Sequence, residues 1–128
     1  MIYTTYFTKL RFLPKHIVPI SIAGKAPDWY KGLECKQLAP KYRFFQEGKK
    51  TGDNDYYIKH YRGEVLSDFD PHIVASELHV RANSGFIALV CYEKTGDFCH
   101  RHLVAEWLNE AGIRCEEWSG ENCFNDHP

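Results

Sequence analysis

The feature that most constrains the fold is an unbroken apolar run, Phe86-Ile87-Ala88-Leu89-Val90-Cys91, which follows directly on Gly85. A strand with one solvent-exposed face alternates apolar and polar side chains, whereas a strand that is covered on both faces is apolar throughout. A run of this length is typical of a central parallel strand with further layers of structure on both sides. The run therefore predicts an α/β domain.

Three further segments are predicted to be strands. Ile2 to Phe7 is rich in β-branched and aromatic residues, Ile17 to Ile22 alternates with apolar side chains at Ile20 and Ile22, and Arg114 to Trp118 alternates enough to form a last strand. Because Pro19 lacks a backbone N–H, the second of them is expected to begin after the proline or to lie at a sheet edge. Together with the apolar run, these segments predict a single three-layer domain with a small, mostly parallel sheet of about four strands flanked by helices.

Four segments are predicted to be helical. They start at Pro40, Asp55, Pro71 and Asp97. The second has apolar residues at spacings of three and four, which is one face of a 3.6-residue period. Asp70 is the expected N-cap of the third, with a proline at its first position. The fourth has an apolar stripe and ends at Gly112, a residue type that commonly ends helices in the left-handed conformation.

Length and composition fit one domain. A chain of 128 residues buries one core but is too short for two ordinary ones, so we expect an α/β domain over residues 1–119 and a flexible tail over 120–128. A formal net charge of -1 gives no overall attraction to nucleic acid or to an anionic membrane, although a local basic patch fits a balanced total. Without a leader or a long apolar run, a cytoplasmic protein with no membrane association is expected.

The five cysteines show no regular spacing. They are Cys35, Cys91, Cys99, Cys115 and Cys123. An odd number of cysteines in a chain without a leader favours reduced thiols over disulfides. No CxxC or HExxH pair is present, so we expect neither a metal site nor a cofactor.

Residues suited to chemistry are concentrated between Cys91 and His102, where the chain passes from the central strand through a loop into a helix. Ligands of open α/β sheets bind at this end of the strands. The loop ends in Gly96 and Asp97, and a thiol, an imidazole and a guanidinium follow in Cys99, His100 and Arg101. The unpaired amides and the positive dipole end of a helix N-terminus favour anions.

Three functions remain open for this segment. In the first, the protein is a small enzyme with Cys99 as nucleophile and with His100 or Glu93 exchanging the proton. Its ligand is phosphate-bearing or nucleotide-like and is held by Arg101 and the loop amides. In the second, the same helix N-terminus binds an anion or nucleic acid without catalysis. In the third, the protein is a structural or interaction protein, and Cys99 packs in its core at helical spacing from Leu103.

The other residues expected to contact a ligand are Gly96, Asp97, Trp29 and Arg101, and the last two have alternative roles. Gly96 and Asp97 offer loop amides to an anion. Trp29 could stack on a planar ligand, and packing against the core is the alternative. Arg101 is expected on the same side of the helix as Glu106, so solvation or a local ion pair is the alternative to ligand binding.

Cys91-Tyr92-Glu93, followed by Cys99-His100-Arg101 and an amphipathic helix, resembles the C-terminal signature of the domain of unknown function 488 family. The resemblance is strongest over Gly85 to Trp118. It implies a compact α/β domain with a Cys-His-Arg site at a helix N-terminus, Glu93 as the acidic member, and no established reaction. The histidine-bearing first strand of other branches is replaced here by Tyr3-Thr4-Thr5-Tyr6.

Overall fold

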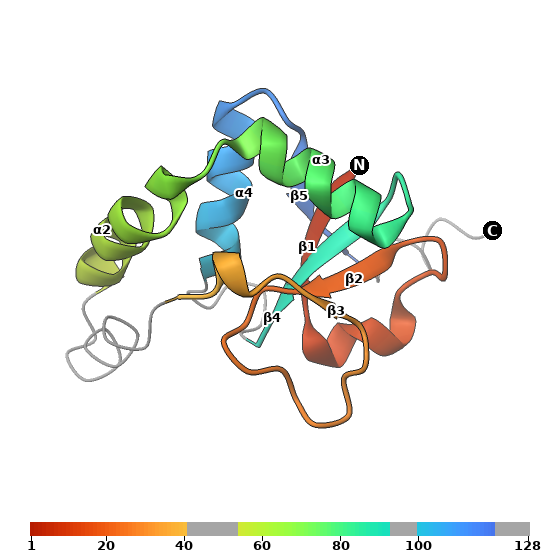
Figure 1. Cartoon of the computed structure of the whole chain (residues 1–128). Coiled ribbons are helices and arrows are strands. Elements are labelled where there is room, and N and C mark those ends of the chain that lie inside the picture. The colour runs from red at the N-terminus through yellow and green to blue at the C-terminus, as the bar shows by residue number, and fades with distance from the viewer. Residues whose placement is uncertain (41–53, 93–99, 120–128) are drawn as a thin grey trace.

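The computed structural model describes residues 1–40, 54–92 and 100–119. Five parallel strands form one sheet in the order β3-β2-β4-β1-β5 (Figure 1). The strands are β1 (Ile2–Tyr6), β2 (Val18–Ser21), β3 (Leu33–Glu34), β4 (Ile87–Cys91) and β5 (Cys115–Glu117). The predicted α/β class is confirmed. The strand missing from the prediction is β3, which is too short to show a period.

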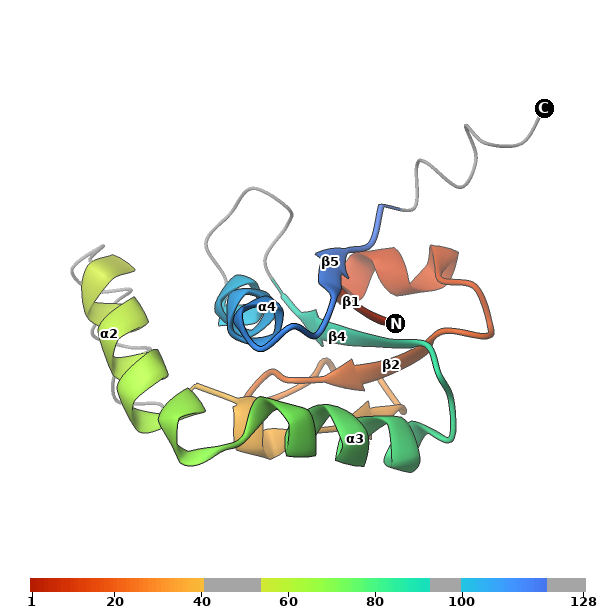
Figure 2. The same ribbon diagram turned by 90° about the horizontal axis from the view of Figure 1, so that it is seen from above.

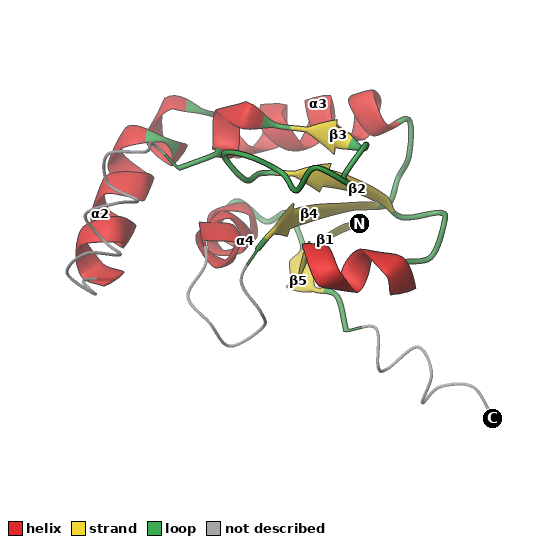
Figure 3. Cartoon of the chain, turned by 90° about the horizontal axis from the view of Figure 1, so that it is seen from below, coloured by secondary structure: helices red, strands yellow, loops and turns green. Residues whose placement is uncertain are grey.

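Helices cover both faces of the sheet. They are η1 (Phe7–Phe12), η2 (Lys36–Leu38), α2 (Asn54–Glu64), η3 (Leu66–Asp68), α3 (Pro71–Ala82) and α4 (His100–Glu110). Figures 2 and 3 show α3 and α4 on one face and η1 on the other, so the three layers are confirmed. The helix expected after Pro40 lies outside the described residues. No helix in the described part of the chain is both long and apolar enough to cross a membrane.

The two faces of β4 explain its unbroken apolar run. Ile87, Leu89 and Cys91 point into the main core beneath α2, α3 and α4. Ala88 and Val90 point the other way, toward smaller clusters formed with η1 and the β2–β3 loop. All five side chains are at most 1% exposed. The predicted central strand, covered on both sides, is confirmed.

Pro19 lies inside β2, which is an interior strand, so the expectation that β2 would start after the proline or form an edge was wrong. The reason is the shortness of β3, which pairs only with Ile20 and Ser21. The N–H groups of Val18 and Ile22 bond to β4 and its flanks, which places the nitrogen of Pro19 on the side of β3. The proline therefore withholds a donor where no strand is present to receive it.

The expected caps define α3 and the end of α4. Oδ1 of Asp70 accepts hydrogen bonds from the backbone N–H groups of His72 (2.8 Å) and Ile73 (3.3 Å). Asn83 ends α3 in the left-handed conformation with φ 51°. Gly112 follows α4 with φ 83°, which a glycine adopts without a steric cost.

An asparagine side chain covers the outer edge of β5. Oδ1 of Asn109 accepts a hydrogen bond from the backbone N–H of Cys115 at 3.1 Å, and its Nδ2 donates to the carbonyl of Cys115 at 2.9 Å. The other side of β5 pairs with β1. The carboxamide therefore makes the hydrogen bonds that a neighbouring strand would make.

Candidate functional site

The strands β1 and β4 are neighbours whose chains continue on opposite faces of the sheet. After β1 the chain enters η1 on one face, and the helix that follows β4 lies on the other (Figure 2). Crevices for ligands in parallel sheets form at such a switch point, outside the carboxyl ends of the strands. Tyr6 and Cys91 are the paired residues at these two ends, and they mark the candidate site.

A completely buried arginine reaches this point from the first turn of α4. The side chain of Arg101 is 0% exposed. Its Nη1 lies 3.0 Å from Cys91 Sγ, and its Nε and Nη2 donate to the two oxygens of Glu117 at 3.0 Å and 2.9 Å. The guanidinium carbon lies 5.6 Å from the ring centre of Tyr6. The hydroxyl of Thr4 donates to Oε1 of Glu117 at 2.6 Å.

These residues form one network, which we call the buried cluster: Thr4, Tyr6, Cys91, Arg101 and Glu117. The alternative interpretation of Arg101 as a solvated residue, or as the partner of Glu106, was wrong. The partner is Glu117 on β5, and Glu106 instead pairs with Arg62. An arginine buried in this way requires a carboxylate with matching geometry, and a two-bond pair supplies it.

His100 is also buried, beside the cluster. Its Nε2 lies 2.7 Å from the carbonyl oxygen of Ile22, and its ring packs edge-on against Tyr61 at 5.5 Å. Burial lowers the pKa of His100 to about 4, with the charges of Arg101 and His102 acting in the same direction and the bond to Ile22 opposing them. The imidazole is therefore neutral at pH 7, and Nε2 donates its proton to Ile22.

The two halves of the signature meet in this cluster, since Cys91 ends β4 and Arg101 lies in the first turn of α4. A family model described as the Active DUF488-N3 subclade matches residues 8–112. The chain belongs to the DUF488 family. The resemblance drawn from the signature is thereby confirmed. Comparisons with curated proteins and with solved structures gave no match.

The cysteines of this DUF488 protein differ in state. Cys35 and Cys115 are free and buried, whereas Cys91 is disulfide-bonded. The expectation of five reduced thiols was therefore wrong for Cys91, because residue spacing does not reveal which sulfur atoms the fold brings together. Burial, followed by the charges of Glu117 and Glu116, raises the pKa of Cys115 to about 12.

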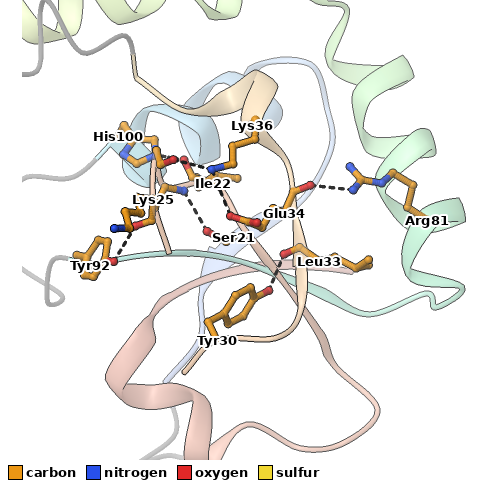
Figure 4. A network of polar contacts seen from close by, with 12 residues as sticks. Ser21, Ile22, Lys25, Tyr30, Leu33, Glu34, Lys36, Arg81, Tyr92 and His100 are labelled. Carbon is orange, nitrogen blue, oxygen red and sulfur yellow. Dashed lines mark hydrogen bonds and ion pairs between the residues drawn. The ribbon is translucent and has the colours of Figure 1, made fainter. Parts of the chain in front are cut away.

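The loop after β2 is fixed at the same edge of the sheet (Figure 4). Three side chains from different elements donate hydrogen bonds to three of its carbonyls. His100 binds Ile22, Lys36 binds Gly24 and Tyr92 binds Lys25, each at 2.7 Å. The loop is therefore preorganised around the carboxyl ends of β2 and β4.

Aromatic rings surround the site on the η1 side. Trp29 is 59% exposed and meets the ring of Phe7 edge-on at 6.1 Å. Tyr92, the residue after β4, also packs against Phe7, with ring centres 4.8 Å apart. Trp29 thus lies at the predicted edge of the sheet and presents its ring to solvent.

A cavity of about 480 Å³ opens between α4 and β5. Its lining includes Thr4, His102, Glu106, Asn109, Cys115 and Glu117. Glu117 belongs both to this cavity and to the buried cluster, and its side chain is 23% exposed. Within the described ranges, no group of three or more histidine, cysteine or acidic side chains is arranged to hold a metal ion.

The predicted site residues divide into two groups. Glu93, Gly96, Asp97 and Cys99 lie outside the described residues. His100, Arg101 and Trp29 are described, and all three lie at the carboxyl edge of the sheet. Sequence reasoning left Thr4, Tyr6, Cys91 and Glu117 out of the site. The position of Cys91 at the carboxyl end of the apolar run was the signal available for it; no local pattern marked Glu117.

Proposed function

We propose that this DUF488 protein is a small enzyme that uses a cysteine thiolate at the carboxyl ends of β1 and β4. The observation that carries the proposal is the contact of 3.0 Å between Nη1 of the fully buried Arg101 and Cys91 Sγ. A cation beside a thiol stabilises the thiolate, which is the nucleophilic form of cysteine. The description of the matching subclade as active supports catalysis as well.

The proposal assigns Arg101 to the thiolate rather than to the substrate. Its Nε and Nη2 are bonded to Glu117, which balances its charge. An anionic group of the substrate would therefore be bound by other donors. For this role we propose the loop amides at Gly96 and Asp97, because amides that precede a helix favour anions.

His100 and Glu93 are the proposed proton-exchanging residues. His100 is neutral at pH 7 with Nε2 bonded to Ile22, so Nδ1 carries the lone pair that accepts a proton. Cys99, the nucleophile predicted from sequence, is the second thiol of the proposed site. The described geometry favours Cys91 as the thiolate, because Arg101 contacts it.

In the proposed reaction, the thiol first passes its proton to His100 or Glu93, and the resulting thiolate then bonds through sulfur to an electrophilic atom of the substrate. The leaving group departs with the bonding electron pair and takes up that proton. Water then hydrolyses the bond between sulfur and substrate and restores the thiol. Since Cys91 is disulfide-bonded in this structure, a dithiol reductant must supply two electrons before the reaction can begin.

The exposed rings of Trp29 and Tyr92 support a nucleotide-like substrate. Both rings contact Phe7 at the switch point, and both are more than half exposed. Planar bases stack on such rings. A nucleotide would place its base here and its phosphate on the loop amides.

The first experiment is a pH titration of thiolate formation, followed by ultraviolet absorbance in the reduced protein. Cys91→Ser should remove a thiolate that forms below the pH range of the other cysteines. Arg101→Gln should shift its formation to higher pH, and Glu117→Gln should shift it to lower pH, because the two side chains carry opposite charges. Cys35→Ser and Cys115→Ser are the matched controls, and neither should affect this thiolate.

Opposite shifts in the two charge variants distinguish an electrostatic role from a structural one, and Glu117→Gln still decides the matter if Arg101→Gln does not fold. A titration that Cys91→Ser leaves unchanged would overturn the assignment of Cys91. If Cys99→Ser alone removes the thiolate, the nucleophile is Cys99. If neither variant alters the titration but adenosine monophosphate raises the melting temperature, the site binds ligand without catalysis.

A further inference from the structure

We infer that the surface formed by η1, the β2–β3 loop and the two ends of β4 binds single-stranded nucleic acid. We call this surface the η1 face. It lies on the opposite side of the sheet from α3 and α4 (Figures 2 and 3). Two independent properties support the inference: a one-sided charge distribution and a concentration of exposed aromatic rings.

The charge of the η1 face is positive. Residues 1–27 contain no aspartate or glutamate but four basic residues, Lys9, Arg11, Lys15 and Lys25, and the exposed Asp28 and Lys31 of the β2–β3 loop offset each other. Arg11, Lys15 and Lys25 are exposed. Glu116, a carboxylate on the η1 side of β5, pairs with Arg114 at 3.4 Å. A basic patch is therefore present within a chain whose total charge is nearly balanced.

Exposed aromatic rings gather on the same face. In the described part of the chain, six large apolar side chains are exposed: Phe12, Trp29, Ile73, Val80, Phe86 and Tyr92. The two aliphatic ones lie on α3. All four aromatic ones lie on the η1 face, where they are 43–59% exposed. Burial of these rings would be favourable, and stacked bases can provide it.

The rings and the cations are interleaved. The guanidinium of Arg11 lies 4.7 Å from the ring centre of Phe12, and Lys15 directly precedes His16, whose ring packs edge-on against Phe86 at 5.1 Å. Phe86 and Tyr92 stand at opposite ends of β4, roughly 20 Å apart at the rise of a strand. This pattern offers stacking surfaces for successive bases and cations for the phosphates between them.

Single strands fit this surface better than the other polyanions. A duplex stacks its bases on one another and would leave the rings unused. Binding to an anionic membrane relies on a continuous apolar helix face, whereas η1 has six residues and its surface is broken by Lys9 and Arg11. The expected ligand is therefore DNA or RNA with unpaired bases.

The test is fluorescence anisotropy with labelled 12-nucleotide single-stranded DNA and RNA of mixed sequence at several salt concentrations. Arg11→Gln/Lys15→Gln/Lys25→Gln should weaken binding at least tenfold and reduce the slope of log K against log salt by about 2, since each lost phosphate contact removes about 0.7. The matched control is Lys59→Gln/Arg62→Gln/Arg81→Gln, which removes three cations of α2 and α3 and should change binding less than twofold.

Stacking is tested separately. Phe12→Leu/Phe86→Leu should weaken binding about fivefold or more with little change in salt slope, while Ile73→Ala/Val80→Ala on α3 should have no effect. These variants avoid the proposed catalytic site, so their outcome is independent of it. Equal losses in the two cation variants would overturn the inference. So would tighter binding to a duplex of the same length, or binding to vesicles containing phosphatidylserine without binding to either oligonucleotide.

Discussion

Arg101 and Glu117 show how a fully buried cation can be matched by a carboxylate, which is itself only 23% exposed. The guanidinium gives two bonds to one carboxylate and a third to a sulfur, and Thr4 binds the same carboxylate. Two charges with such geometry offset much of the cost of leaving water, whereas one of them alone cannot. The pair is therefore a unit, and its members should not tolerate separate replacement.

Separate and joint replacement of the pair should differ. Arg101→Met should lower the free energy of unfolding by about 3 kcal/mol, because it leaves the carboxylate of Glu117 partly buried without its partner. Arg101→Met/Glu117→Leu should recover at least half of that loss. Urea denaturation of the two variants and the wild type gives these values. A double variant less stable than Arg101→Met would contradict this account of the pair.

His100 should make stability depend on pH. Its pKa is about 4 in the folded protein and 6.5 when unfolded, so the unfolded chain binds the extra proton as the pH falls through this window. The free energy of unfolding should therefore fall between pH 6.5 and about pH 5 by about 2 kcal/mol. His100→Gln keeps a donor for Ile22 and should abolish this part of the slope. Equal slopes in urea titrations of both proteins would rule out His100 as the cause.

Among the elements, β5 is held in place by side chains as much as by its neighbour. It pairs with β1 along one edge, and α4 covers its other edge through Asn109. Glu117 ties it to Arg101 at the start of α4. The three-residue strand β5 is therefore bonded to both ends of α4.

Removal of the asparagine should weaken this arrangement. Asn109→Ala leaves the N–H and carbonyl of Cys115 without their partners and should cost about 1–2 kcal/mol of unfolding free energy. Asn109→Asp should cost at least as much, because it loses the donor and sets a carboxylate beside a carbonyl. Thermal unfolding measures both. Glu110→Ala, the next residue along, should cost less than about 0.5 kcal/mol, and an equal effect there would show that the loss is not specific.

At the scale of the whole molecule, the elements that could be predicted are those determined by residues close together in the sequence. The apolar run identified β4, and Asp70 with its following proline identified the start of α3. Burial of Arg101 was not predictable, because its partner Glu117 lies on β5, beyond the far end of α4. No local pattern in the sequence marked the disulfide of Cys91. The carboxyl edge of the sheet could be located from sequence, but the residues that meet there depend on strand order.

The closed edge of β5 also affects how copies of this protein behave toward one another. At the opposite end of the sheet, β3 presents only two residues, while the outward backbone of Cys115 on β5 is already bonded. A foreign strand needs several adjacent unpaired peptide groups to attach. Neither of these two edges provides them. The folded protein therefore offers little template for fibril growth along them, even in concentrated solution.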